Sequence, residues 1–217
     1  MFVSRRELID MLWPTKEYGR ARSCLYVTLS ALRAAMGQHE TGPQYLLTQG
    51  EGLALNREFA TSDTNLFDPL AREILTHGDR LDAKQAVEAC LKLEGIYKGP
   101  LQVPDAGDTS LFTRLRDMYA SKYVDCMVRG IDEALDVENL SAAGWLAEAA
   151  LRQEPNREDL IRRAMKVYGL MGRRREAARV YQAHLGYLQR ELHDAPEIET
   201  REMYERVVGP GKGELLI

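Results

Sequence analysis

Two similar stretches decide the fold of this chain: NLSAAGWLAEAAL over Asn139–Leu151 and RRREAARVYQAHL over Arg173–Leu185. They align without a gap at an offset of 34 residues. Four positions pair small or apolar residues: Ala143 with Ala177, Leu146 with Val180, Ala147 with Tyr181, and Leu151 with Leu185. Because these positions recur every three or four residues, each stretch predicts an amphipathic helix. The small residues would let two helices approach closely, and the larger ones would fill the groove beside them.

An offset of 34 residues is the period of tetratricopeptide repeats, whose unit is a pair of helices. One unit cannot bury its apolar face alone, so it needs stacked neighbours. From Asp63 onwards the sequence supplies them, with further helical patterns over residues 67–76, 81–93, 109–135, 157–171 and 197–208. We therefore predict a mainly α fold, with a tetratricopeptide-like helical-repeat domain over residues 63–208 and a flexible tail over residues 209–217.

Residues 1–57 predict a different arrangement. Ser4-Arg-Arg-Glu7 has the form of a capping box, in which a hydroxyl and a carboxylate each bond the other's backbone, so a short helix is expected up to Trp13. A longer helix is expected from Arg20 to Met36, closed by Gly37 in a left-handed cap. Its predicted core face is Leu25, Leu29, Leu32 and Met36.

Two short apolar runs flank the turn Gln49-Gly-Glu-Gly52 and predict a β-hairpin. Helix, short turn, longer helix and hairpin is the order found in the second half of a winged helix-turn-helix. A helical hairpin followed by an isolated β-ribbon explains the same pattern equally well. The sequence pattern alone leaves both interpretations open.

The net charge of the chain is −4, but the charge is unevenly spread. Residues 1–57 contain seven Lys and Arg against five Asp and Glu, which makes this section mildly basic. That excess is too small to predict nucleic-acid binding by charge alone.

The cysteines Cys24, Cys90 and Cys126 are far apart and form no metal-ligand spacing with one another or with histidine. Scattered, unpaired cysteines are typical of a reducing compartment. No apolar run approaches the roughly 20 residues of a membrane span. We therefore expect a cytoplasmic protein without a membrane segment.

No nucleophile elbow, phosphate-binding loop, zinc-protease motif or Gly-rich dinucleotide motif occurs in the sequence. The four histidines show no metal spacing, and His184 falls on Ala150 in the repeat alignment. This alignment favours a packed or half-exposed helix histidine over a metal ligand. We predict that the protein is not an enzyme and requires neither a cofactor nor a metal.

Several segments resemble one bacterial family of regulators. VSRRELIDMLWP, ARSCLYVTLSALRAAMG and YLLTQGEGLALN resemble the middle helix, the recognition helix and the wing in the DNA-binding head of the streptomycete antibiotic regulatory protein family. LEGIYKGPL, LRQEPNREDLIRRAMKVYGLMGRRREAARVYQ and LQRELHDAPEIETREMYERVV are similar to the bacterial transcriptional activator domain that follows this head. The resemblance implies that residues 1–57 are a partial winged helix-turn-helix, without its N-terminal strands and first helix.

The resemblance implies a bacterial transcriptional regulator, of the activator type, that binds promoter DNA. The second helix of the head would enter the major groove, and the wing would touch an adjacent groove or the backbone. The candidate DNA contacts carried over are Arg20, Arg22, Ser23, Tyr26, Ser30 and Arg33. The helical domain would mediate protein–protein interaction or self-association. The alternative is a helical-repeat adaptor whose head does not bind DNA.

Two further features allow a functional and a structural interpretation. The densest basic cluster contains Arg162, Arg163, Lys166, Arg173, Arg174 and Arg175. It is either a docking patch for nucleic acid or an acidic partner, or a solvated hairpin turn, and the second interpretation is favoured. Trp145, which falls opposite Arg179 in the repeat alignment, lies either at a boundary of the helix stack or exposed in a partner groove.

Overall fold

The computed structural model describes residues 2–76, 81–102 and 110–209. The chain divides into two compact units, Met1–Ser62 and Asp63–Ile217, which we call the head and the helical domain. Apart from Gly209, the predicted flexible tail lies outside the described residues.

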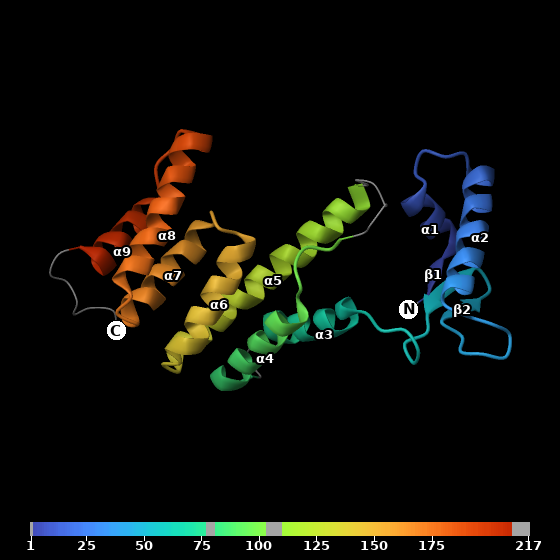
Figure 1. Cartoon of the computed structure of the whole chain (residues 1–217), viewed down its shortest axis with the longest axis horizontal. Coiled ribbons are helices and arrows are strands. Elements are labelled where there is room, and N and C mark those ends of the chain that lie inside the picture. The colour runs from blue at the N-terminus through green and yellow to red at the C-terminus, as the bar shows by residue number, and fades with distance from the viewer. Residues whose placement is uncertain (1, 77–80, 103–109, 210–217) are drawn as a thin grey trace. The chain divides into compact units, whose positions relative to one another are not determined.

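The head contains two helices and a small sheet (Figure 1). Its elements are β1 (Val3–Ser4), α1 (Arg5–Leu12), α2 (Tyr18–Ala35), β2 (Leu46–Gln49) and β3 (Gly52–Leu55). The sheet is antiparallel with the strand order β1-β3-β2. The predicted order of helix, turn, helix and hairpin is confirmed, but the third strand, β1, was not predicted.

The strand β1 arises because Ser4 serves two elements. Its backbone is extended, with φ −70° and ψ 149°, so it pairs with Gly52 and also stands before the first turn of α1. The capping box is present: the Glu7 N–H donates to Ser4 Oγ over 3.1 Å, and the Ser4 N–H donates to Glu7 Oε2 over 2.9 Å. Gly52 lacks a Cβ, which would lie 3.1 Å from the Cβ of Phe2. Glycine at this position therefore permits the close approach of the edge strand.

The hairpin turn is held by the start of α1. Gly50 has φ +57°. The turn types favoured in two-residue hairpin loops, I′ and II′, both require a positive φ at this first central residue. The Arg5 N–H donates to the Glu51 carbonyl over 3.0 Å, and Arg5 Nη1 donates to the Gly50 carbonyl over 2.7 Å. The predicted wing turn is thus anchored to the neighbouring helix by one arginine.

The core of the head is small. Its fully buried members are Ile9, Ala21, Leu25, Leu29, Leu46 and Leu53. The prediction for Leu32 was wrong, because this side chain is 40% exposed and Ala21 is buried instead. Helix α1 has eight residues and α2 has eighteen, so α1 can cover only part of the length of α2. A side chain on the inner side of α2 beyond that part can therefore still be exposed.

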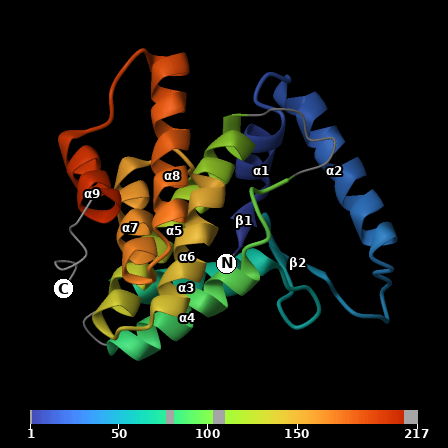
Figure 2. The ribbon, with the colours of Figure 1, turned by 60° about the vertical axis from the view of Figure 1, so that its left-hand side comes forward.

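The helical domain is a succession of antiparallel helices, as Figures 1 and 2 show. Its elements are α3 (Asp63–Thr76), α4 (Ala83–Ile96), α5 (Ser110–Asp136), α6 (Leu140–Gln153), α7 (Glu158–Leu170), α8 (Arg174–Tyr187), the π-helical turn η2 (Leu188–Leu192) and α9 (Ile198–Val208). Successive helices pack on each other, and α9 packs on both α7 and α8. The predicted mainly α fold is confirmed. Among the described residues, no helix is long and apolar enough to cross a membrane.

The repeat positions predicted from the 34-residue offset face the core. Ala143 and Ala177 are fully buried, and Tyr181 is buried where it stacks on Tyr204 of α9, with ring centroids 4.1 Å apart. The structure also decides two open questions: His184 is buried, whereas Trp145 is exposed over 55% of its surface. Trp145 is therefore on the solvent side of α6 and outside the core of the helix stack.

Candidate functional site

The start of α2 is capped by an acidic side chain. Glu17 Oε1 accepts the N–H of Gly19 over 2.9 Å, and Glu17 Oε2 accepts the N–H of Arg20 over 3.2 Å. This cap explains why the helix begins at Tyr18, two residues before the predicted start. Because a carboxylate already occupies the positive end of the helix, this end is closed to a phosphate group.

All six predicted DNA contacts lie on α2. Four of them are exposed and, within the described part of the chain, make no hydrogen bond or ion pair with another element: Arg20, Arg22, Tyr26 and Ser30. The Arg22 guanidinium lies 5.7 Å from the centre of the Tyr26 ring. A hydrogen bond with Tyr26 raises the pKa of Arg22 above its ordinary value, so the cation is retained. Arg22 and Tyr26 thus form one exposed cation–π pair on the polar side of the helix.

The other two candidates are engaged within the head. Ser23 Oγ donates to the Gly19 carbonyl one turn earlier over 3.2 Å. Arg33 is half-buried, and its Nη2 donates to Thr48 Oγ1 on β2 over 3.3 Å. Arg33 therefore ties α2 to the hairpin, and its side chain is less available for a ligand than that of Arg22.

A cleft of about 340 Å³ adjoins the polar face of α2. Its lining residues are Ser4, Arg5, Arg6, Ile9, Tyr18, Arg22 and Glu51. Sequence reasoning missed Arg5 and Arg6 as site residues, because the capping box explained them as the start of a helix. The signal that could have found them is the pair of adjacent arginines inside that motif.

The predicted basic cluster of the helical domain does not act as one patch. Arg162 Nη1 forms an ion pair with Glu197 and donates to Thr200 Oγ1 over 2.9 Å. Arg163 holds Asp132 of α5 with two parallel bonds of 2.9 Å, a bidentate geometry that is among the strongest ion pairs. These two arginines join helices to each other, so for them neither the docking patch nor the solvated turn describes the structure.

The rest of the cluster lies around the turn between α7 and α8. Lys166 is half-buried on α7, whereas Arg173, Arg174 and Arg175 are exposed at the beginning of α8. Gly172, at φ +71°, makes the left-handed turn that separates the two helices. Only the three arginines of this turn remain accessible to a ligand.

Glu158, the first residue of α7, gathers polar groups from α8 and α9. Its carboxylate accepts the Glu197 N–H over 3.0 Å and also the Thr200 hydroxyl. His184 Nε2 lies 3.2 Å from Glu158 Oε1, although not in good hydrogen-bond alignment. Thr200 and His184 are the buried polar residues among those described. One carboxylate thus connects the C-terminal helix to the repeat stack.

This carboxylate makes the stability of the helical domain sensitive to acid. Burial alone would raise the pKa of Glu158, but the bonds from Thr200 and the Glu197 backbone, together with the adjacent His184 imidazole, outweigh burial, so the pKa lies below its ordinary value. A lowered folded pKa contributes stability that is present above the ordinary carboxyl pKa of about 4.3 and is lost as the pH falls through the folded pKa. We expect Glu158→Gln to lose less stability than the parent chain over this acidic range, as measured by urea unfolding at a series of pH values. An equal loss in both proteins would contradict the assignment.

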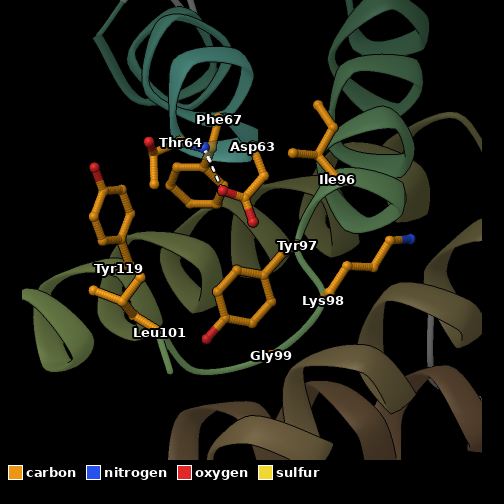
Figure 3. Close-up of a pocket in the computed structure, with 9 residues that line it drawn as sticks. All are labelled: Asp63, Thr64, Phe67, Ile96, Tyr97, Lys98, Gly99, Leu101 and Tyr119. Atoms are coloured by element: carbon orange, nitrogen blue, oxygen red, sulfur yellow. Dashed lines mark hydrogen bonds between the residues drawn. The ribbon is translucent and has the colours of Figure 1, made fainter. Parts of the chain in front are cut away.

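The helical domain also contains a small pocket between α3, α4 and α5, which Figure 3 shows. The Thr64 N–H donates to Asp63 Oδ1 over 2.8 Å at its rim. Tyr97 belongs to the GIYKGPL motif, and its ring stacks on Tyr123 with centroids 4.1 Å apart. The cavity of about 40 Å³ has room for a few water molecules, far less than a typical small-molecule site. Tyr97 therefore packs the loop that follows α4 onto α5. The pocket is too small to indicate a small-molecule substrate.

Two of the three thiols, those of Cys90 and Cys126, are buried in the helical domain. Burial raises the pKa of Cys90 and of Cys126 to about 12, so both remain protonated. Cys90 Sγ donates to the Cys126 carbonyl over 3.2 Å, a contact between α4 and α5. Among the residues that the structure describes, no three His, Cys, Asp or Glu side chains gather as metal ligands.

The solved structure of Mycobacterium tuberculosis EmbR in complex with a low-affinity phosphopeptide has a similar fold. The TM-score is 0.66 at 21% sequence identity, and the match covers 96% of this chain. It covers 55% of the EmbR chain, so the present chain spans about half of that protein's length. No curated protein matches the chain.

In addition to this structural similarity, the helical domain matches a family model. Residues 62–208 match the model of the bacterial transcriptional activator domain. This range includes the repeat pair α6 and α8, the GIYKGPL loop and the C-terminal helix α9. The chain belongs to the bacterial transcriptional activator domain family.

Proposed function

We propose that the protein is a cytoplasmic, DNA-binding transcriptional regulator that activates transcription. Its head docks on promoter DNA, and its helical domain holds a protein partner or a second copy of the chain. No catalytic step is involved, so the mechanism is recruitment.

The observation that carries this proposal is the polar face of α2. Arg22, Tyr26 and Ser30 are exposed at intervals of four residues along one side of α2, next to a hairpin fastened to the first helix by Arg5. Arginine suits phosphate oxygens and guanine edges, and hydroxyls suit phosphates. A helix of eighteen residues that presents such a face has the dimensions to lie in the major groove.

Family membership and the EmbR likeness support the effector half of the proposal. The activator-domain family is named for transcriptional activation. EmbR was solved with a phosphopeptide, which supports a protein ligand for a molecule of this general fold. On the helical domain, the exposed Trp145 is a candidate anchor for a partner, because large exposed aromatics are frequent in protein interfaces.

The test is a gel shift of the full chain with mixed-sequence duplex DNA over a range of salt concentrations. We expect binding at low salt that weakens as salt rises, because phosphate contacts release counterions. The double variant Arg22→Ala/Tyr26→Ala removes two neighbours on one side of α2 and should bind at least roughly tenfold more weakly. Arg72→Ala, which removes one exposed arginine from α3 and so makes the same change in charge, is the matched control and should bind like the parent chain. Equal binding by the double variant and the parent chain would exclude this side of α2.

A specific feature favours the adaptor as the second candidate function. Beside its polar face, α2 exposes Val27 over 70% of its surface, and the turn of the hairpin carries the acidic Glu51. An apolar helix face suits a protein partner better than a phosphate backbone. Absence of binding to duplex DNA at every salt concentration would favour the adaptor.

A further inference from the structure

The cleft beside α2 concentrates positive charge from two helices. Arg5 and Arg6 come from the first turn of α1, and Arg22 comes from the first two turns of α2. Glu51 is the acidic side chain of the lining, and it is 81% exposed, with Arg5 Nη1 3.5 Å from its Oε2. Three cations against one exposed carboxylate leave a surplus of positive charge in a concave site.

The three arginines differ in how they are held. Arg5 is only 15% exposed, and its guanidinium is fixed by the Gly50 carbonyl. Its Nε–H is buried and has no acceptor within the described part of the chain. Arg22 lies against the ring of Tyr26, which orients the cation without neutralising it. Within the described residues, Arg6 is exposed and forms no ion pair.

This combination of one fixed, one oriented and one free arginine is suited to an anion with several oxygen atoms. Arginine bonds phosphate through two parallel N–H groups, and the Tyr18 hydroxyl in the lining adds a further possible donor. The volume of about 340 Å³ admits a phosphate together with part of the group that carries it. The positive end of α2 is closed by Glu17, so the cleft is the better anion site on this side of the head.

We propose that the cleft formed by Arg5, Arg6 and Arg22 binds a backbone phosphate of nucleic acid, with Arg6 as a contact that lies outside α2. This inference rests on the proposed function and extends it to a second helix. Because Arg5 also holds the hairpin turn, a phosphate bound here would join α1, α2 and the hairpin at one point. It would set the position of the head on the duplex without reading the sequence.

The test compares Arg6→Ala with Arg72→Ala in the full chain, by measuring the affinity for mixed-sequence duplex DNA as a function of salt. Both substitutions remove one exposed arginine from a helix, so their effects on net charge are equal. Loss of one phosphate contact should weaken binding at low salt and reduce the slope of log K against log salt by about 0.9 in Arg6→Ala alone. Equal slopes in the two variants would overturn the cleft as a DNA contact while leaving the proposed function in place.

A second measurement separates the cleft from the proposed function. Inorganic phosphate is added to the full chain at constant ionic strength, and the arginine Nε–H signals are followed by nuclear magnetic resonance. We expect the Arg5, Arg6 and Arg22 signals to shift with phosphate and not with chloride, and absence of a shift would overturn the anion site. If phosphate shifts these signals but duplex DNA does not bind at any salt, the nucleic-acid assignment fails together with the proposed function.

Discussion

Replacement of Glu158 by alanine should lower the free energy of unfolding of the helical domain by about 3 kcal/mol. The substitution leaves the buried Thr200 hydroxyl and the Glu197 N–H without their shared acceptor, and it removes the carboxylate beside the buried His184. Because these groups lie on α8 and α9, the loss should begin as detachment of α9. Urea unfolding gives the size of the effect, and hydrogen exchange of the α9 amides gives its location.

The matched control is Glu88→Ala, which removes an exposed glutamate from the middle of α4. Surface changes of this kind usually stay within about 0.5 kcal/mol of the parent protein. If Glu158→Ala lowered the free energy of unfolding no more than the control does, Glu158 could not be the connection between α7 and the C-terminal helix. If the loss were large but hydrogen exchange rose evenly over all helices, the local detachment of α9 would be excluded.

A pair of glycine substitutions should change stability in opposite directions. In Gly130→Ala the new Cβ would lie 2.7 Å from the Cβ of Cys90 and 2.8 Å from Cδ1 of Leu146. Because α5 is in close contact with both α4 and α6 there, relief requires movement of whole helices. We expect a loss of about 2 kcal/mol, since the overpacking exceeds the gain in helix propensity.

Gly95→Ala makes the same chemical change in α4, where the new Cβ would meet no atom within 4 Å. Alanine is the better helix former, so a gain of about 0.5 kcal/mol is expected. Thermal and urea unfolding of both variants measure the difference. A gain in stability from Gly130→Ala would show that the junction of α4, α5 and α6 is looser than the structure indicates.

The predicted helices came from local signals, and these signals were dependable where one residue type controls the backbone. The capping box at Ser4 and Glu7 is present with both bonds, and the predicted cap glycine Gly37 and the turn glycine Gly50 both have positive φ. The strand β1 was missed because two residues carry no periodicity of their own. Its partner is Gly52, nearly fifty residues away, and pairing over such a distance is not written in a local pattern.

The candidate site shows the same division. The polar stripe Arg22, Tyr26 and Ser30 of α2 follows from helical spacing, and all three residues are exposed. The bond between Arg33 and Thr48 depends on how α2 packs on the sheet. The ion pairs of Arg162 with Glu197 and of Arg163 with Asp132 depend on how the helices pack on one another. In the sequence these arginines look like one basic cluster, because the sequence does not reveal which carboxylates lie opposite them.

The sequence by itself determined the 34-residue repeat, the mainly α class and the placement of a helix-turn-helix-like section before it. These are properties of residues close together in the chain, where backbone geometry imposes a short period. Only the tertiary structure decided that Arg5, Arg6 and Arg22 share a cleft, that His184 is buried against Glu158, and that Trp145 is exposed. Each of these depends on contacts between distant segments, because burial and charge pairing are set by which helices pack together.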